Sequence, residues 1–273
     1  MNPDRIYRQH RDNALAKQIT ATKYTTFVAM PFGDRYSYRS REIYEKLIKE
    51  AAIRATKLEK AKRPFDKPRR VDDEPSTAKV ITEDIVVSIL ESHIFIGDLT
   101  FENPGVVLEV GVALGLKPNK QIILIMQGSD KDLHFDIRNN RVVFYSQSNA
   151  VEQIANAMIA GANAFEADCK KHIESISQTL SPDAILCLNW YGIMRRDNPG
   201  VEISLHQGTI PKYYNGNQVR FREATLELLS KKLIWTDYQV GAIPLGDAWG
   251  MHATELGWAV IENMWKDLRR PKS

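Results

Sequence analysis

Short apolar segments alternate with helical patterns between residues 20 and 150. Four apolar runs have the length and composition of buried strands, at residues 25–30, 93–99, 121–126 and 141–145. Three segments are predicted as helices, at residues 40–57, 76–92 and 103–116. A further short strand is predicted near Arg70 and Val71. Because only a few residues connect most of these elements, the alternation predicts a parallel α/β sheet that helices cover on both faces.

The predicted sheet also indicates where a ligand would bind. In open parallel sheets, ligands bind at the carboxyl ends of the strands. The segments that follow the strands are residues 30–35, 72–76, 98–103 and 127–136. We therefore expect a site at this edge, with Asn103 and Asp136 among its substrate-binding residues.

The chain divides into four parts. Residues 1–22 form a polar N-terminal extension, and residues 23–150 form the α/β domain. Residues 151–182 are predicted as a connecting helix, and residues 183–273 as a smaller α+β domain. The sequence contains no internal repeat and no low-complexity segment.

Composition argues against several classes of protein. The net charge of +3 is too small, for a chain of this size, to indicate nucleic-acid binding. No apolar run approaches the roughly 18 to 20 residues that span a bilayer, so no membrane contact is expected. The polar N-terminus lacks the apolar core of a signal peptide. The cysteines, Cys169 and Cys187, have unrelated surroundings, which predicts a reduced, cytoplasmic protein.

Common catalytic motifs are absent from the sequence. There is no G-x-G-x-x-G loop, P-loop, H-E-x-x-H pair or G-x-S-x-G elbow. Their absence argues against a dehydrogenase, a kinase, metal catalysis and a serine triad. We therefore expect neither a metal ion nor a cofactor.

Glu109 is the most informative single residue. Its neighbours in the predicted helix, from Gly105 to Gly115, are all apolar or glycine, and a helix that is apolar all round is expected to be buried. A buried, unpaired carboxylate costs several kcal/mol or takes up a proton. Glu109 is therefore a candidate catalytic residue. The alternative is that it caps a neighbouring element or pairs with a buried arginine or lysine.

Two further features lie at strand ends. Asp98 ends an apolar strand, where its carboxylate could accept a hydrogen bond from a ribose hydroxyl, or could simply cap the next turn. The residues after the first strand are Met30, Pro31, Phe32 and Gly33. Their backbone could approach a phosphate or a base, or they could form a tight turn with Phe32 packed inward.

Several segments carry a family resemblance. They are FVAMPFGD at 27–34, VVSILESHIFIGDLT at 86–100, NPGVVLEVGVALGLKPNKQIILIMQ at 103–127 and FDIRNNRVVFY at 135–145. This stretch, roughly residues 25–146, resembles the nucleoside 2-deoxyribosyltransferase-like superfamily, in particular its TIR-like nucleotide-binding branch. The resemblance implies a Rossmann-like or flavodoxin-like sheet.

The resemblance also implies a function. The glutamate matching Glu109 would act at the anomeric carbon of a ribose, and the aspartate matching Asp98 would help to bind the sugar or base. Family members cleave N-glycosidic bonds in nucleosides, nucleotides or NAD, and some transfer the sugar. Other relatives only bind nucleotides. Several members complete their site with a second subunit, so a homo-oligomer is expected.

The C-terminal segment resembles the second half of a winged helix. The residues that carry the resemblance are ATLELLSKKLIW at 224–235 and HATELGW at 252–258. Basic and acidic side chains are mixed on the helix at 219–232, so DNA contact is not required. Winged helices also serve as protein-interaction and dimerisation modules.

Three readings follow. The first is an enzyme that hydrolyses or transfers at the N-glycosidic bond of a nucleotide or nucleoside, such as NAD or a (deoxy)nucleoside monophosphate. The second is a non-catalytic nucleotide sensor coupled to the C-terminal domain, and the third is a structural interaction protein. In the family that this chain resembles, a nucleotide-cleaving domain is commonly paired with a sensor domain, in systems of bacterial defence.

Overall fold

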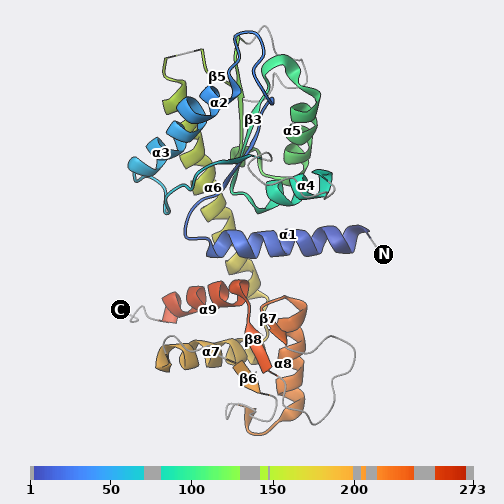
Figure 1. The fold of residues 1–273 in the computed structure, drawn as a ribbon. Helices are drawn as coiled ribbons and strands as arrows, with labels where there is room; N and C mark the ends of the chain where they lie inside the picture. The colour runs from blue at the N-terminus through green and yellow to red at the C-terminus, as the bar shows by residue number, and fades with distance from the viewer. Residues whose placement is uncertain are drawn as a thin grey trace. The chain divides into compact units, whose positions relative to one another are not determined.

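The computed structural model describes residues 3–70, 81–129, 142–146, 148–198, 204–206, 214–236 and 250–268. The chain forms two compact units, residues 1–168 and 169–273, and the division falls within helix α6 (Ala150–Gln178). Figure 1 labels the elements of both units. No helix in the described ranges is long and apolar enough to cross a membrane.

A five-stranded parallel sheet forms the centre of the first unit. Its strands, in spatial order, are β2 (Arg69–Arg70), β1 (Thr26–Ala29), β3 (Ile94–Asp98), β4 (Ile122–Met126) and β5 (Val142–Phe144). Every neighbouring pair runs parallel. The predicted α/β fold class is therefore confirmed, with all five predicted strands present within a few residues of their expected bounds.

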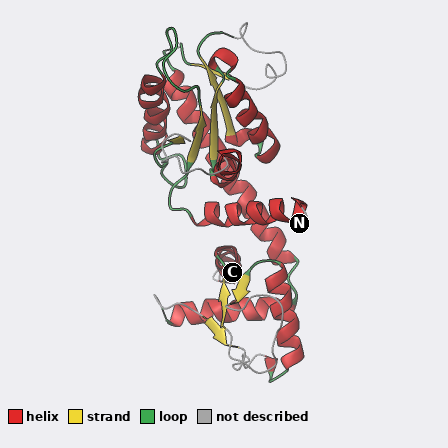
Figure 2. Cartoon of the chain, turned by 45° about the vertical axis from the view of Figure 1, so that its right-hand side comes forward, coloured by secondary structure: helices red, strands yellow, loops and turns green. Residues whose placement is uncertain are grey.

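Helices cover both faces of this sheet, as Figures 1 and 2 show. One face carries α2 (Ser40–Ile43), the π-helical turn η1 (Tyr44–Lys49), α3 (Glu50–Lys57) and α6. The other carries α4 (Ile81–Glu91) and α5 (Pro104–Leu116). The strand order explains this division. The chain moves one way from β1 to β2 and the other way from β2 to β3, so right-handed crossovers place the helices on opposite faces.

Helix α5 lies very close to strand β3. A methyl group built on Gly97 would lie 2.6 Å from Val110 Cγ2, and 3.1 Å from the Phe95 ring. The absence of a side chain at Gly97 thus lets Val110 pack directly onto the strand backbone. This contact fixes the depth of α5 relative to the carboxyl end of β3.

The N-terminal segment is more than a polar extension. Helix α1 (Pro3–Thr20) packs against α4, and its residues Ala14 and Gln18 are buried. The Gln18 amide donates hydrogen bonds to the carbonyl oxygens of Leu90 and Ser92, at 2.8 and 2.5 Å. These carbonyl groups lie at the C-terminal end of α4, where the helix itself provides no N–H partner for them. Helix α1 therefore belongs to the first unit.

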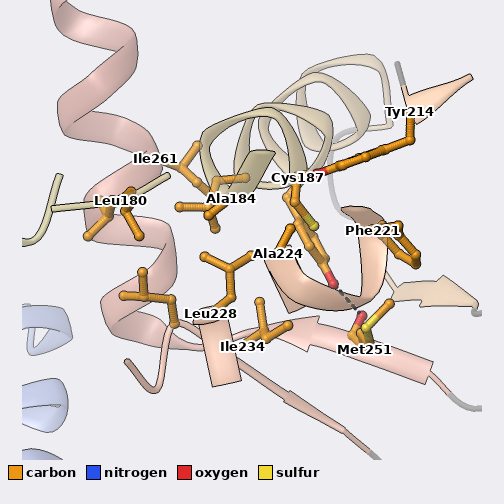
Figure 3. Close-up of a cluster of buried hydrophobic side chains, with 14 residues drawn as sticks. Leu180, Ala184, Cys187, Tyr214, Phe221, Ala224, Leu228, Ile234, Met251 and Ile261 are labelled. Atoms are coloured by element: carbon orange, nitrogen blue, oxygen red, sulfur yellow. Dashed lines mark hydrogen bonds between the residues drawn. The ribbon is translucent and has the colours of Figure 1, made fainter. Parts of the chain in front are cut away.

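The second unit has its own core. Helices α7 (Pro182–Asp197), α8 (Gln218–Ser230) and α9 (Glu255–Leu268) enclose apolar side chains together with the antiparallel sheet β6 (Ser204–His206), β8 (Gly250–Ala253) and β7 (Ile234–Thr236). Figure 3 shows this core. The Tyr191 hydroxyl is buried in the same cluster and donates to the Met251 carbonyl at 2.8 Å. Residues 197–218 are rich in glycine, proline and asparagine, a composition typical of a loop, yet β6 lies within them.

Some predictions fall outside the described residues. These are the first residues of the helix predicted at 76–92, the segment 72–76, and the predicted site residue Asp136.

Gly97→Ala should destabilise the first unit by about 1 to 3 kcal/mol, because the new methyl group displaces Val110 or bends β3. Urea unfolding followed by far-UV circular dichroism measures this loss. Tryptophan fluorescence reports separately on the second unit, since all five tryptophans lie beyond residue 168.

Gly115→Ala is the matched control. An added methyl group there meets nothing within 4 Å, and alanine is the better helix former by up to about 1 kcal/mol. Equal midpoints for Gly97→Ala and the wild type would contradict the close packing of α5 on β3.

Candidate functional site

The strand order reverses between β1 and β3. In a 2-1-3-4-5 sheet this reversal marks the switch point at which ligands bind, outside the carboxyl ends of the strands. Two segments flank it: residues 30–39 after β1, and residues 99–103 after β3. The candidate site is therefore built from these segments, with α5 beginning directly behind the second.

Asp98 ends β3 and is completely buried. Its Oδ1 accepts hydrogen bonds from the Thr100 hydroxyl at 2.6 Å and from the Thr100 backbone N–H at 3.1 Å. Its Oδ2 accepts from the Tyr38 hydroxyl at 3.0 Å and from the Tyr145 hydroxyl at 3.4 Å. Asp98 thus caps the turn that follows it, as one of the two interpretations expected, and it also joins distant segments.

The hydrogen bonds extend beyond Asp98 to the other strand ends. The Thr100 hydroxyl lies 2.7 Å from the Tyr145 hydroxyl and accepts from the Gln127 backbone N–H at 2.9 Å. Gln127 follows β4, Tyr145 follows β5, and Tyr38 lies after β1. One cluster of polar groups, the Asp98 network, therefore connects the carboxyl ends of four strands.

Burial governs the protonation of this network. Loss of hydration raises the pKa of Asp98 to about 6, although the hydrogen bonds from Thr100, Tyr38 and Tyr145 act in the opposite direction. Burial and the nearby Asp98 charge raise the pKa of the Tyr38 and Tyr145 hydroxyls, so both remain protonated donors. Both carboxylate oxygens of Asp98 accept hydrogen bonds from protein groups. A hydrogen bond between Asp98 and a ribose hydroxyl therefore stays a prediction.

Glu109 lies in α5, one and a half turns after the cap. As predicted, Asn103 begins this helix: its side-chain oxygen accepts from the backbone N–H groups of Gly105 and Val106, at 3.0 and 3.3 Å. The Glu109 side chain is partly buried, and burial alone raises its pKa to about 7. Among the described residues it has no hydrogen-bond or ion-pair partner, so the alternative of a buried arginine or lysine partner is not supported there.

The predicted burial of α5 on all sides is wrong. Val106, Val110 and Ala113 pack against the sheet, but several apolar residues on the far side are exposed, namely Val107, Leu108, Gly111, Leu114 and Gly115. Leu108 retains 65% of its exposure. The apolar composition therefore reflects a core face and a second, uncovered face, with Glu109 between them.

The two predicted catalytic carboxylates are carried by contacting elements. Val110 follows Glu109, Gly97 precedes Asp98, and these two neighbours pack directly on one another. No hydrogen bond joins Glu109 to Asp98 in the described part of the chain. The two groups have different environments: Asp98 is enclosed by donors, whereas Glu109 has an apolar and partly open surrounding.

The Met30–Gly33 segment has two parts. Met30 and Pro31 are buried, whereas Phe32 and Gly33 are exposed. Phe32 is 64% exposed, so the alternative of a turn with Phe32 packed inward is wrong. Gly33 has a φ of +72°, a conformation that other residues rarely adopt.

Sequence reasoning missed the partners of Asp98 and an exposed ring cluster. Thr100 could have been found as a hydroxyl two residues after a strand-end aspartate. Tyr38 and Tyr145 offered no such signal, because they are 60 and 47 positions away from Asp98. The rings of Tyr36 and Phe101 also approach one another at this edge, with centroids 6.0 Å apart.

A separate cavity lies at the opposite, amino edge of the sheet. Its volume is about 170 Å³, below the size of typical ligand pockets, which begin at about 300 Å³. His93 lines it, accepts from the Thr25 N–H, and is held neutral because burial lowers its pKa to about 4. Lys17 and Glu91 form an ion pair at its rim. This cavity is therefore too small to enclose a typical small-molecule ligand.

The described residues contain no group of three or more histidine, cysteine or acidic side chains that could hold a metal ion.

Tyr38→Phe should destabilise the first unit by about 1.5 to 3 kcal/mol at pH 8, where Asp98 is ionised and loses a charged hydrogen bond. At pH 5 Asp98 is largely protonated, and the loss should shrink to about 0.5 to 1.5 kcal/mol. Urea unfolding at the two pH values measures the difference.

Tyr36→Phe removes a hydroxyl two residues earlier, on an exposed ring, and should leave stability unchanged at both pH values. An equal effect of Tyr38→Phe at pH 5 and pH 8 would show that Asp98 does not titrate in this interval.

Neither a search against models of known protein families nor a search of curated proteins finds a match for this chain.

Proposed function

We propose that the protein cleaves or transfers at the N-glycosidic bond of a nucleotide or nucleoside, such as NAD or a (deoxy)nucleoside monophosphate. The observation that carries the proposal is Glu109, a partly buried carboxylate with a pKa near 7 and no described partner. Maintaining such a group costs stability, because burial disfavours its charged form. Groups of this kind cluster at functional sites.

The chemistry requires a carboxylate of this kind. As the C1–N bond breaks, its electron pair leaves with the base and positive charge develops on the sugar. An ionised Glu109 beneath the anomeric carbon would stabilise that charge or form an ester with it. Water, or a second acceptor, would then bond to C1, and any ester bond to Glu109 would break and return the carboxylate. The proton that the acceptor loses would pass to the departed base or to solvent. The apolar surroundings of Glu109 would strengthen the interaction by excluding water.

The resemblance to the nucleoside 2-deoxyribosyltransferase-like superfamily supports the same assignment. The segment from Asp98 through Asn103-Pro104 to Glu109 and Gly111 carries its specific part. The resemblance implies that Asp98 helps to bind the sugar or base. Its contacts suit it better to position the strand ends. We infer that Asp98 acts through Tyr38 and Thr100 on the geometry of the site.

A nucleotide sensor without chemistry is the second candidate. It is favoured by the separate core of residues 169–273, whose α8, β7, β8 and α9 follow the order of a winged-helix module. We propose that this unit contacts protein partners, with DNA as the alternative. Arg220 on α8 is already held by Asp183, at 2.9 Å from Nε to Oδ2, and Lys231 donates to Thr179 at 3.1 Å.

We also propose a homo-oligomer, in which α5 packs against α5 of a second copy. Val107, Leu108 and Leu114 present an apolar face, and Gly111 has open space above it, which allows a close approach between helices. A twofold interface needs a surface that is complementary to itself, and a flat apolar helix face satisfies this.

Glu109→Gln should lower base release from the substrate by at least about 10²-fold, because the neutral amide cannot stabilise the developing charge. Chromatography of purified protein incubated with NAD, nucleosides and nucleoside monophosphates measures the release. In the wild type, kcat/KM should fall about tenfold per pH unit below pH 7, since only ionised Glu109 is active.

The same variant should be more stable than the wild type at pH 8 and equally stable at pH 4. Because the folded pKa of Glu109 is raised, the wild type loses stability as pH rises through about 7, and glutamine removes this loss. Glu50→Gln, on the exposed side of α3, is the matched control. Base release that survives in Glu109→Gln would exclude Glu109 as the catalytic group.

Leu108→Asp should shift the protein towards monomers, because a charge on the α5 face cannot be buried against a second copy. Size-exclusion chromatography with light scattering measures the mass. Val219→Asp, at an equally exposed apolar position on α8, should leave the mass unchanged. A wild type that is monomeric at high concentration would contradict the proposed interface.

A further inference from the structure

An exposed group of rings and one arginine bridges the switch point of the sheet. Arg35 and Tyr36 come from the segment after β1, and Phe101 comes from the segment after β3. Tyr36 is 77% exposed and Phe101 is 41% exposed. The Arg35 guanidinium carbon lies 5.4 Å from the Tyr36 ring centroid and 5.6 Å from that of Phe101. We call these three residues the ring clamp.

The backbone at the ring clamp adopts an unfavourable conformation. Tyr36 and Phe101 have φ angles of +50° and +62°, and Glu102 has +47°. Such left-handed conformations cost residues other than glycine about 1 kcal/mol or more, and they cluster at ligand sites. Two large rings are thus held on the surface, at a cost in conformation and in exposed apolar area.

The Asp98 network supports the ring clamp from beneath. The Phe101 ring contacts the buried Tyr38 ring, with centroids 5.8 Å apart, and the Tyr38 hydroxyl donates to Asp98. Thr100, which also binds Asp98, immediately precedes Phe101. The position of Phe101 is therefore fixed by the same contacts that join the strand ends.

Arg35 differs from its neighbour Arg39 in its partners. Arg39 donates to the carbonyl oxygens of Tyr36 and Tyr38, at 2.7 and 3.1 Å, and lies 3.9 Å from Asp34. Within the described ranges, the Arg35 guanidinium has no hydrogen-bond or ion-pair partner, and it lies over the two rings. Its planar N–H groups are thus available to an anion, and this fork matches the oxygens of a phosphate.

We propose that the ring clamp binds nucleoside phosphates, with the base stacked on the Phe101 ring and in edge contact with Tyr36, whose ring is inclined by 62° to that of Phe101, and with a phosphate paired with Arg35. The inference rests on the proposed function, since it names the substrate class of that site. Exposed aromatic rings bind flat apolar rings, and an arginine without an ion-pair partner binds anions. A nucleotide carries both groups in one molecule. Nucleotides, rather than free nucleosides, are the ligands of this protein.

Isothermal titration calorimetry on the full chain carrying Glu109→Gln tests the proposal without turnover. The probes are the 5′-monophosphates of adenosine, guanosine, cytidine and uridine, the four nucleosides, and NAD. At least one nucleotide should bind ten or more times tighter than its nucleoside. Arg35→Gln should remove that preference and its salt dependence, and leave nucleoside binding unchanged.

Phe101→Ala should weaken nucleotides and nucleosides alike, by about 5- to 100-fold, whereas Phe101→Trp should retain binding. Arg54→Gln, an exposed arginine paired with Glu152 on the same unit, is the control and should change nothing. Circular dichroism verifies that each variant is folded.

The outcomes separate this proposal from the proposed function. Nucleotide binding that depends on Arg35 and Phe101, without base release by the wild type, would support the ring clamp and overturn the enzyme. Base release whose KM is unchanged by Arg35→Gln and Phe101→Ala would overturn the ring clamp and leave the enzyme intact. Equal binding of nucleosides and nucleotides, or no binding of any probe, would also overturn it.

Discussion

The carboxylate of Asp98 holds the carboxyl edge of the sheet together. Without it, the segments after β1, β3, β4 and β5 would be joined there mainly by strand pairing, because Tyr38, Thr100 and Tyr145 all converge on this group. A charge in this position is costly, and the raised pKa of about 6 reflects the cost. The four hydrogen bonds to Asp98 offset much of it, and they order the surface above.

Glu109 has the contrasting environment. Burial raises the pKa of both carboxylic acids, but donors surround Asp98 and none of the described residues serves Glu109. Different surroundings commonly give two acids in one site different roles. Here they agree with the proposed division, in which Asp98 positions the strand ends and Glu109 is the reacting group. Because Val110 packs on Gly97, movement of β3 would be transmitted to the helix that carries Glu109.

The sequence was sufficient to predict the strands and helices of the parallel sheet and the positions of Asp98 at a strand end and Glu109 in a helix, because these depend on local pattern. The catalytic role of the two carboxylates stays a prediction. Strands such as Ile94–Asp98 are continuous apolar runs, and Asn103-Pro104 is a local helix start. The convergence of Tyr38 and Tyr145 on Asp98 was not predictable, since it depends on which strands become neighbours. The exposed side of α5 was misjudged for a related reason. An apolar helix face can pack against the chain's own core or against another molecule, and composition alone does not distinguish the two cases.

The Asp98 network also constrains how this sequence can diverge. Loss of the tyrosine at 38, the threonine at 100 or the tyrosine at 145 removes one of the hydrogen bonds to a buried acceptor, so a substitution at any of these positions should cost more stability while the aspartate is present. Homologous chains that retain the site should therefore share an Asp-x-Thr, a tyrosine before it and another after it. The spacings, 60 and 47 positions in this chain, should differ between homologues only through the lengths of the loops. Such a pattern identifies distant descendants by coupled positions where overall similarity has faded.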